Sequence, residues 1–145
     1  MFPEMVDDLL VRGSDDWVML TELDWVVKSN ATRYGVSLDP SARISVGIEV
    51  LRRVIENGLM QPGDVIKEPP EFVTWDLSGP AALERIESGW RALGENLQMG
   101  DVCWLENTSA GDSHAEAVLE QVNRRANWPP SNQQADRQSD EPERS

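Results

Sequence analysis

RISVGIEVLRRVIENGLMQPGDV, residues 43–65, is the stretch of this 145-residue chain that decides the fold. Its apolar residues Ile44, Ile48, Leu51 and Ile55 recur every three or four positions, which places them on one face of a helix. The charged residues between them fall on the other faces. The pattern predicts an amphipathic helix with one buried side and one side facing solvent.

The end of this helix is also predictable. Asn57 and Gly58 form a C-cap, because glycine adopts the left-handed backbone conformation without a Cβ clash. Leu59 then stands where a Schellman motif places an apolar contact back onto Val54. Gly47, inside the helix, lowers helix stability by about 1 kcal/mol relative to alanine. It marks either a close approach of another helix or a position where glycine has no specific role.

Two segments precede this helix. The apolar residues at positions 5–10 predict a short docking helix or a frayed end, and residues 17–29 predict a helix capped by Ser14, Asp15 or Asp16. The buried stripe of that helix is expected to be Met19, Leu20, Leu23, Val26 and Val27. Residues 30–42 are interpreted as a loop or a loop with one short helical turn, with Ser41 as the N-cap of the helix that follows.

Two more helices are expected downstream. One opens at Ser78-Gly79-Pro80 and ends at Gly94, with a core stripe of Leu83, Ile86, Trp90 and Leu93. The last runs over residues 111–125, is capped by Thr108 or Ser109, and carries Val118 and Val122 on its inner side.

Short strands are expected at residues 65–66, 72–75 and 102–105, the first preceded by a turn at residues 61–64. Strands this close in sequence favour a small antiparallel sheet beside the helices. The fold class is therefore α+β: a mainly helical single domain over residues 15–127. Residues 1–14 form an acidic N-terminal segment, and residues 128–145, poor in apolar residues, are expected to be disordered.

The net charge of −13 disfavours nucleic acid and membrane surfaces as partners. Its distribution is uneven: of the four segments 1–24, 25–55, 56–120 and 121–145, only residues 25–55 have more cations than acids, and they contain the opening helix. No run of 18 apolar residues is present and the N-terminus is acidic, so we expect a cytoplasmic protein without a membrane span.

Known catalytic and cofactor motifs are absent from the sequence. It has no glycine-rich phosphate loop and no GxSxG nucleophile elbow. One histidine, His114, and one cysteine, Cys103, leave no ordinary zinc ligand set, and Cys103 between Val102 and Trp104 is expected to be a buried strand residue. We therefore predict no enzyme activity, no cofactor and no metal, while an enzyme built from scattered carboxylates stays open.

One combination of segments resembles the winged-helix domains of bacterial transcription regulators. The helix end ENGLM at residues 56–60 and the segment LENTSAG at residues 105–111, which leads into the last helix, are similar to the end of a recognition helix and the end of a wing. The resemblance covers residues 17–66 and 102–125, with a helix inserted in the wing. It implies DNA contacts from Arg43, Arg52 and Arg53, with Ser45 and Glu49 beside them.

Two functions follow from these observations. The first is a regulatory or interaction protein that binds a basic protein partner through acidic residues, of which the N-terminal set is Asp15, Asp16, Glu22 and Asp24. The alternative is a transcription regulator that binds DNA through the helix at residues 43–57. Charge favours the first, because few cations face DNA phosphates and many acids oppose their approach. The sequence does not predict an oligomeric state.

Overall fold

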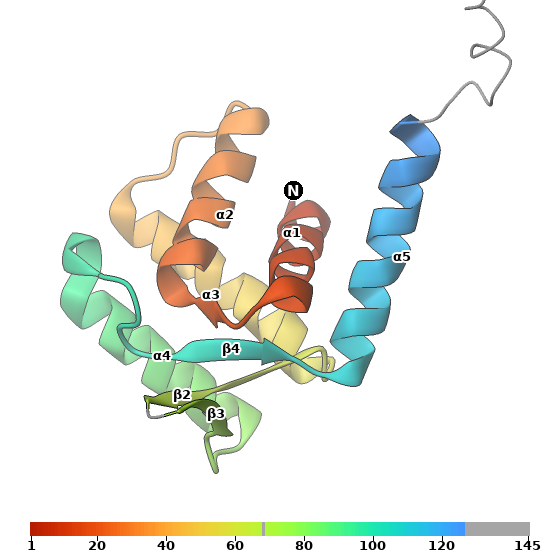
Figure 1. Cartoon of the computed structure of the whole chain (residues 1–145). Coiled ribbons are helices and arrows are strands. Elements are labelled where there is room, and N and C mark those ends of the chain that lie inside the picture. Colours follow the sequence, from red (N-terminus) through yellow and green to blue (C-terminus); the bar gives the residue numbers. More distant parts are fainter. Residues whose placement is uncertain (68, 127–145) are drawn as a thin grey trace, which may run out of the picture. The chain divides into compact units, whose positions relative to one another are not determined.

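The computed structural model describes residues 1–67 and 69–126 (Figure 1). The chain divides into a compact unit, Met1–Ala115, and a second unit, Glu116–Ser145. The predicted disordered tail, residues 128–145, lies outside the described residues. Residues 1–14 form most of the first helix, whose Met5, Leu9 and Leu10 are fully buried in the same core as the rest of the first unit.

Five helices dominate the described residues, and a small antiparallel sheet accompanies them, which confirms a mainly helical α+β fold. The helices are α1 (Phe2–Asp15), α2 (Leu20–Arg33), α3 (Pro40–Glu56), α4 (Gly79–Leu93) and α5 (Ser109–Ala126), with a short 3-10 turn at Gly94–Asn96. The strands are β1 (Val18–Met19), β2 (Met60–Lys67), β3 (Pro70–Thr74) and β4 (Trp104–Asn107).

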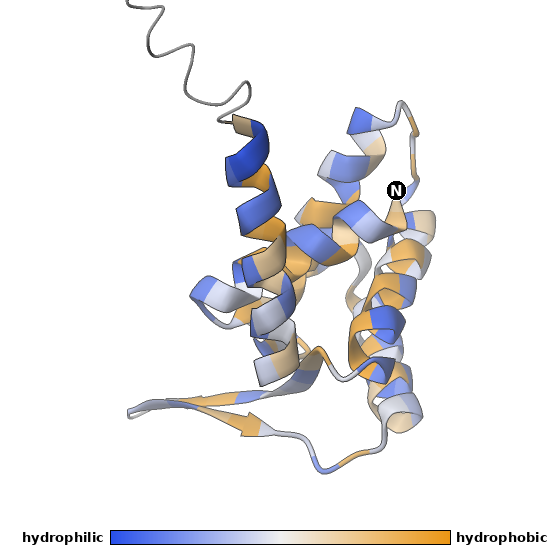
Figure 2. Ribbon diagram, turned by 90° about the vertical axis from the view of Figure 1, so that its right-hand side faces the viewer, coloured by the Kyte–Doolittle hydropathy of each residue, from blue (hydrophilic) through white to orange (hydrophobic). Residues whose placement is uncertain are grey.

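The sheet has the strand order β1-β4-β2-β3, with every pair antiparallel. Its central strand is β4: Leu105 is paired with Val18 on one side and Pro62 on the other. The strand that closes the sheet therefore comes late in the sequence and joins two segments that precede it by more than 40 residues. Figure 2 shows the β2–β3 hairpin projecting away from the helices.

The helix predicted around residues 43–55 is confirmed as α3. Ile44, Ile48 and Leu51 are buried and Ile55 is partly buried. The Schellman end also forms, since the Leu59 amide donates to the Val54 carbonyl at 2.8 Å and the Gly58 amide donates to the Ile55 carbonyl at 3.1 Å. Gly58 has φ +69, the conformation for which glycine was expected.

Gly47 marks a close helix approach. A Cβ at this position would lie 2.5 Å from the outer ring edge of Trp90 in α4. Trp90 is 1% exposed, and Leu83 and Ile86 from the same stripe are also buried. The stripe predicted for α4 is confirmed at these three positions, and its N-cap is Ser78, whose hydroxyl accepts from the Ala81 amide.

The predicted helix over residues 17–29 is wrong at its start. Val18 and Met19 form β1, and α2 begins at Leu20 with no side-chain cap. The predicted caps Ser14 and Asp15 belong to α1 instead, and Asp16 follows it. Pairing with Leu105 and Trp104 at the far end of the chain decides this segment, which no helical pattern can reveal.

Three other boundaries differ from the sequence-based expectation. The N-cap of α3 is Asp39, whose carboxylate accepts from the Ala42 amide at 2.7 Å, and not Ser41. The turn expected at residues 61–64 lies within β2, since strand pairing extends to Met60. The last strand begins at Trp104, because Val102 has φ +71 and cannot continue a strand.

The start of α5 is capped as predicted, since the Thr108 hydroxyl accepts from the Gly111 amide at 3.1 Å. The inward placement predicted for Val122 is wrong: its side chain is 51% exposed. Residues 116–126 belong to the second unit, whereas the core cluster ends at Ala115.

Candidate functional site

The arginines at the C-terminal end of α3 are paired with carboxylates. Arg52 lies 3.3 Å from Glu49 and 3.9 Å from Glu56, and Arg53 lies 3.3 Å from the other oxygen of Glu49. The Arg53 guanidinium also stacks 4.5 Å from the ring centre of Phe2. Two of the three cations that the winged-helix resemblance assigns to DNA are thus balanced by acids of their own helix.

The third of these cations, Arg43, is paired with Asp24 of α2 at 3.1 Å, and both side chains are largely buried. Ser45, placed beside the DNA contacts by the same resemblance, accepts a hydrogen bond from Arg91 of α4 at 2.8 Å. Arg91 also donates to Ser41. A side chain from α4 therefore contacts the start of α3, beside Arg43.

The four acids predicted to bind a partner are not brought together. Glu22 lies 3.8 Å from Arg12, and Asp24 pairs with Arg43. Asp15 and Asp16 instead lie together at the end of α1, exposed to solvent. The sequence set thus separates into two acids that neutralise arginines and two that face water.

Asp15 and Asp16 line a pocket with two acids from distant parts of the chain, Glu106 in β4 and Asp112 in α5. We call this the acidic pocket; its volume is about 290 Å³. Its residues are Gly13, Ser14, Asp15, Asp16, Trp17, Glu106, Asn107 and Asp112. No lysine, arginine or histidine is among these lining residues.

Hydrogen bonds hold Glu106 in place at this pocket. The Trp17 indole N–H donates to one of its carboxylate oxygens at 3.2 Å, and Gln61 donates to the other at 3.2 Å. The Trp17 ring packs in turn against Phe72, with ring centres 6.1 Å apart. The pocket therefore has a tryptophan and a carboxylate whose positions are set by neighbouring strands.

Asn107 forms part of the pocket wall and joins α1 to the start of α5. Its amide nitrogen donates to the Leu10 carbonyl at 2.9 Å and to Asp112 at 3.1 Å. Its buried oxygen Oδ1 has no hydrogen-bond partner among the described residues. This amide lies directly over Gly13, where a Cβ would collide with it, so glycine at position 13 permits the wall to form.

This arrangement has a clear chemical preference. Four carboxylates can accept hydrogen bonds from an ammonium or guanidinium group, and an indole ring favours a nearby cation. The signal was only half present in the sequence. Asp15 and Asp16 stood out, but Glu106 and Asp112 did not, because only the pairing of β1 with β4 brings them close.

The remaining candidates do not form a second polar centre. Cys103 is buried, and burial raises the pKa of its thiol to about 12. His114 Nε2 lies 2.8 Å from Asp7, so it joins α5 to α1. Among residues 1–67 and 69–126, no group of three His, Cys, Asp or Glu side chains has the arrangement of a metal site.

Within the same residues, no helix has both the length and the apolar character needed to cross a membrane. Comparison of the chain with protein-family models, with curated proteins and with solved structures finds no match.

Proposed function

We propose that this chain is a non-enzymatic cytoplasmic regulatory or interaction protein whose acidic pocket binds a basic segment of a protein partner. The observation that supports the proposal is the pocket itself: two exposed acids of α1 stand with Glu106 and Asp112, and no cation lines it. Elsewhere Glu22 and Asp24 lie beside arginines. The pocket brings four acids from separate segments together, and Asp15 and Asp16 among them are exposed.

The chemistry of the partner follows from the pocket lining. A lysine or arginine side chain brings a cation to Asp15 and Asp16, while its aliphatic stem packs on Trp17. The net charge of −13 steers a basic segment toward the protein and raises the association rate at low salt.

A winged-helix arrangement remains part of the proposal. The order α1-β1-α2-α3-β2, with β4 between β1 and β2, supports it. If β2 and β4 are taken as the two wing strands, the segment inserted between them comprises β3 and α4. In this arrangement α3 would be the recognition helix. Its Ser45 is already bonded to Arg91, and its Arg52 and Arg53 are already paired with Glu49. These groups are therefore less available to DNA phosphates, which favours protein contacts over DNA contacts.

DNA binding through α3 is the second candidate, favoured by the excess of cations in residues 25–55. It predicts DNA affinity that falls steeply with salt and is weakened in the double variant Arg52→Glu, Arg53→Glu. Fluorescence anisotropy with labelled genomic fragments at low salt measures this directly. Anisotropy that stays flat for every fragment removes the candidate.

The acidic pocket is tested by titrating hexa-arginine and hexa-lysine peptides into the protein by calorimetry. The variant Asp15→Asn, Asp16→Asn is expected to weaken binding by about tenfold or more, since two charge contacts of about 1 kcal/mol are lost. The asparagine at position 16 preserves the hydrogen bond that Asp16 accepts from the Trp17 amide.

The matched control is Glu84→Gln, Glu95→Gln, which removes the same charge from exposed positions outside the pocket. We expect it to keep most of the affinity. Equal losses in the two variants would mean that the peptides respond to net charge alone, and the pocket assignment would then be wrong.

A further inference from the structure

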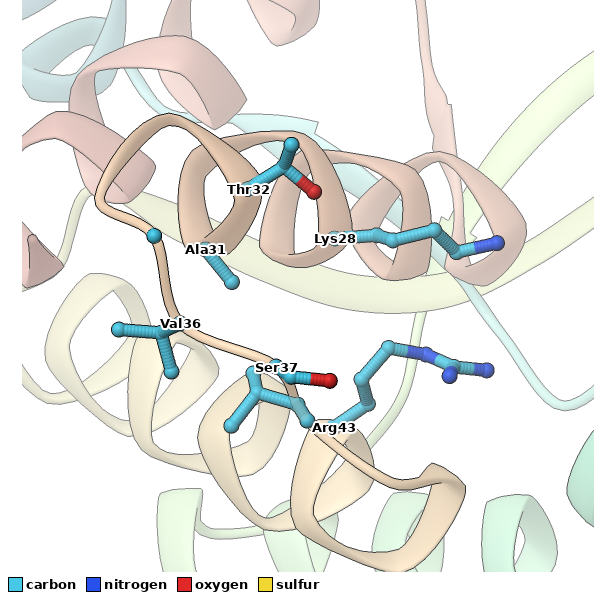
Figure 3. Close-up of a pocket in the computed structure, with 8 residues that line it drawn as sticks. Lys28, Ala31, Thr32, Val36, Ser37 and Arg43 are labelled. Atoms are coloured by element: carbon cyan, nitrogen blue, oxygen red, sulfur yellow. The ribbon is translucent and has the colours of Figure 1, made fainter.

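A second pocket, of about 450 Å³, lies between α2 and α3 and has the opposite electrostatic character (Figure 3). We call it the α2–α3 pocket. Its lining residues are Lys28, Ala31, Thr32, Gly35, Val36, Ser37, Leu38 and Arg43. Both charged residues in this lining are cations. The volume is in the range of small-molecule sites, about 300–1,000 Å³.

The two cations reach the same side of the pocket. In Figure 3 the side chains of Lys28 from α2 and Arg43 from α3 extend in the same direction, with the Ser37 hydroxyl on that side. Arg43 uses Nε for its bond to Asp24 at 3.1 Å, which leaves its terminal nitrogens for other acceptors. Lys28 is exposed and forms no ion pair with any described residue.

The other part of the lining is apolar. Ala31, Val36 and Leu38 supply methyl groups. Val36 is 41% exposed, so its apolar side chain can be reached from solvent. The hydroxyl of Thr32 adds a hydrogen-bonding group from α2. The pocket thus has a cationic end and an apolar end, the pattern that suits an amphiphilic anion.

The walls of this pocket are held by backbone hydrogen bonds at both helix ends. The Gly35 amide donates to Thr32 at 3.0 Å and the Val36 amide donates to Ala31 at 2.8 Å, which closes α2. Gly35 has φ +71, so the chain turns sharply there. Asp39 then caps α3. A ligand would therefore meet a largely preformed site and lose little affinity to ordering.

We propose that the α2–α3 pocket binds a small organic anion, a carboxylate or phosphate monoester with a short apolar chain, its charge between Lys28 and Arg43 and its chain against Val36. The protein as a whole repels anions, so this local pair is the feature that makes such binding favourable. Asp24, already paired with Arg43, and Glu95 are the acids that share an adjoining pocket with Lys28 and Arg43, and Asp39 is engaged as a helix cap.

The test is a calorimetric and NMR titration of the full chain with hexanoate, hexyl phosphate, inorganic phosphate and hexanol. We expect hexanoate or hexyl phosphate to bind at least tenfold more tightly than hexanol and inorganic phosphate, because only they satisfy both ends. Tighter binding of one of the two assigns the carboxylate or the phosphate as the anionic group.

Variants locate the site. Lys28→Met and Val36→Asp should each weaken binding about tenfold, the loss that corresponds to about 1.4 kcal/mol, while Arg52→Met, a cation lost elsewhere from α3, should leave it unchanged. Both altered residues are exposed, so folding is expected to survive, and the thermal unfolding midpoint verifies this.

Two results would overturn the proposal: neither amphiphile binds, or binding weakens equally in Arg52→Met. A short DNA duplex is the remaining probe, and Lys28-dependent binding of the duplex alone would assign these cations to nucleic acid instead. The variant Asp15→Asn, Asp16→Asn should bind the amphiphile normally, so failure here is distinct from failure of the acidic pocket.

Discussion

At the scale of single residues, one hydrogen bond between Glu4 in α1 and Tyr34 after α2 couples folding to pH. The Tyr34 hydroxyl donates to the Glu4 carboxylate at 2.6 Å. This bond, with a smaller contribution from the N-terminal ammonium, lowers the pKa of Glu4 from 4.5 to about 2. The same bond raises the pKa of Tyr34 above its ordinary value of 10.

The sign of the effect follows from linkage. A lowered carboxyl pKa contributes stability that is present above pH 4.5 and is lost as the pH falls toward 2. We expect Tyr34→Phe to be less stable than the parent at pH 7, and the difference in unfolding free energy to shrink between pH 4.5 and pH 2. Urea unfolding across this range measures it, and a difference independent of pH would contradict the assignment.

Above pH 10 the raised pKa of Tyr34 gives the opposite dependence. The stability from the bond is present below that pH and disappears as the hydroxyl ionises in the folded state. The difference between the parent and Tyr34→Phe should therefore shrink at both extremes of pH.

Cys103 permits a second prediction at this scale. Its thiol is 1% exposed, and burial, with a smaller contribution from Asp64, raises its pKa from 9 to about 12. Because the thiolate is the reactive form, the native protein at pH 8 should react with a disulfide reagent roughly a thousandfold more slowly than the urea-unfolded chain. Comparable rates would show that Cys103 is accessible.

At the scale of elements, the contact between α3 and α4 depends on one missing side chain. Gly47 lets the Trp90 ring approach the α3 backbone, and a Cβ there would lie 2.5 and 2.7 Å from two ring carbons. Trp90 is itself 1% exposed and has little room to move. Close packing at this crossing therefore outweighs the cost of a glycine inside a helix.

We predict that Gly47→Ala destabilises the protein by about 1–3 kcal/mol, the usual cost of overpacking, although alanine is the better helix former by about 1 kcal/mol. The matched control is Gly79→Ala in the first turn of α4, where the added Cβ would meet Ile55 at an ordinary 3.6 Å. Chemical denaturation of both variants measures the difference. A stabilised Gly47→Ala protein would show that the two helices are not in close contact.

At the scale of the molecule, β4 holds together two segments of the first unit that are remote from each other in sequence, β1 and β2. Leu105 in this strand is fully buried and pairs with Val18 and Pro62. We expect Leu105→Ala to cost about 2–5 kcal/mol, as for other large core truncations. The same change at Leu119, which is 42% exposed, should cost less than about 0.5 kcal/mol. Equal melting temperatures for the two variants would contradict this account.

The charge map also acquires its meaning at this scale. The sequence identified a basic window, but Arg43 is paired with Asp24 from another helix, and Arg91 of α4 donates a hydrogen bond to Ser45. The two sites proposed for binding are the acidic pocket and the α2–α3 pocket. Neither could be delimited from charge counts along the chain.

The features that depend on local physics could be predicted from the order of the residues. The apolar spacing of α3 and α4, the left-handed Gly58 with its Schellman bonds, the Ser78 cap and the Thr108 cap all formed as expected. In each, the interacting groups lie within a few residues of one another. Backbone sterics and helix periodicity are then sufficient to predict the outcome.

The features that join distant segments could not be predicted, because they depend on how the elements pack in three dimensions. Val18 and Met19 follow a helical pattern, yet they form β1 because Leu105 and Trp104 are available as partners. That same pairing brings Glu106 to Asp15 and Asp16 and creates the acidic pocket. The physical reason is that hydrogen bonding and burial between remote segments outweigh local propensity, and no spacing along a single chain records which segments will meet.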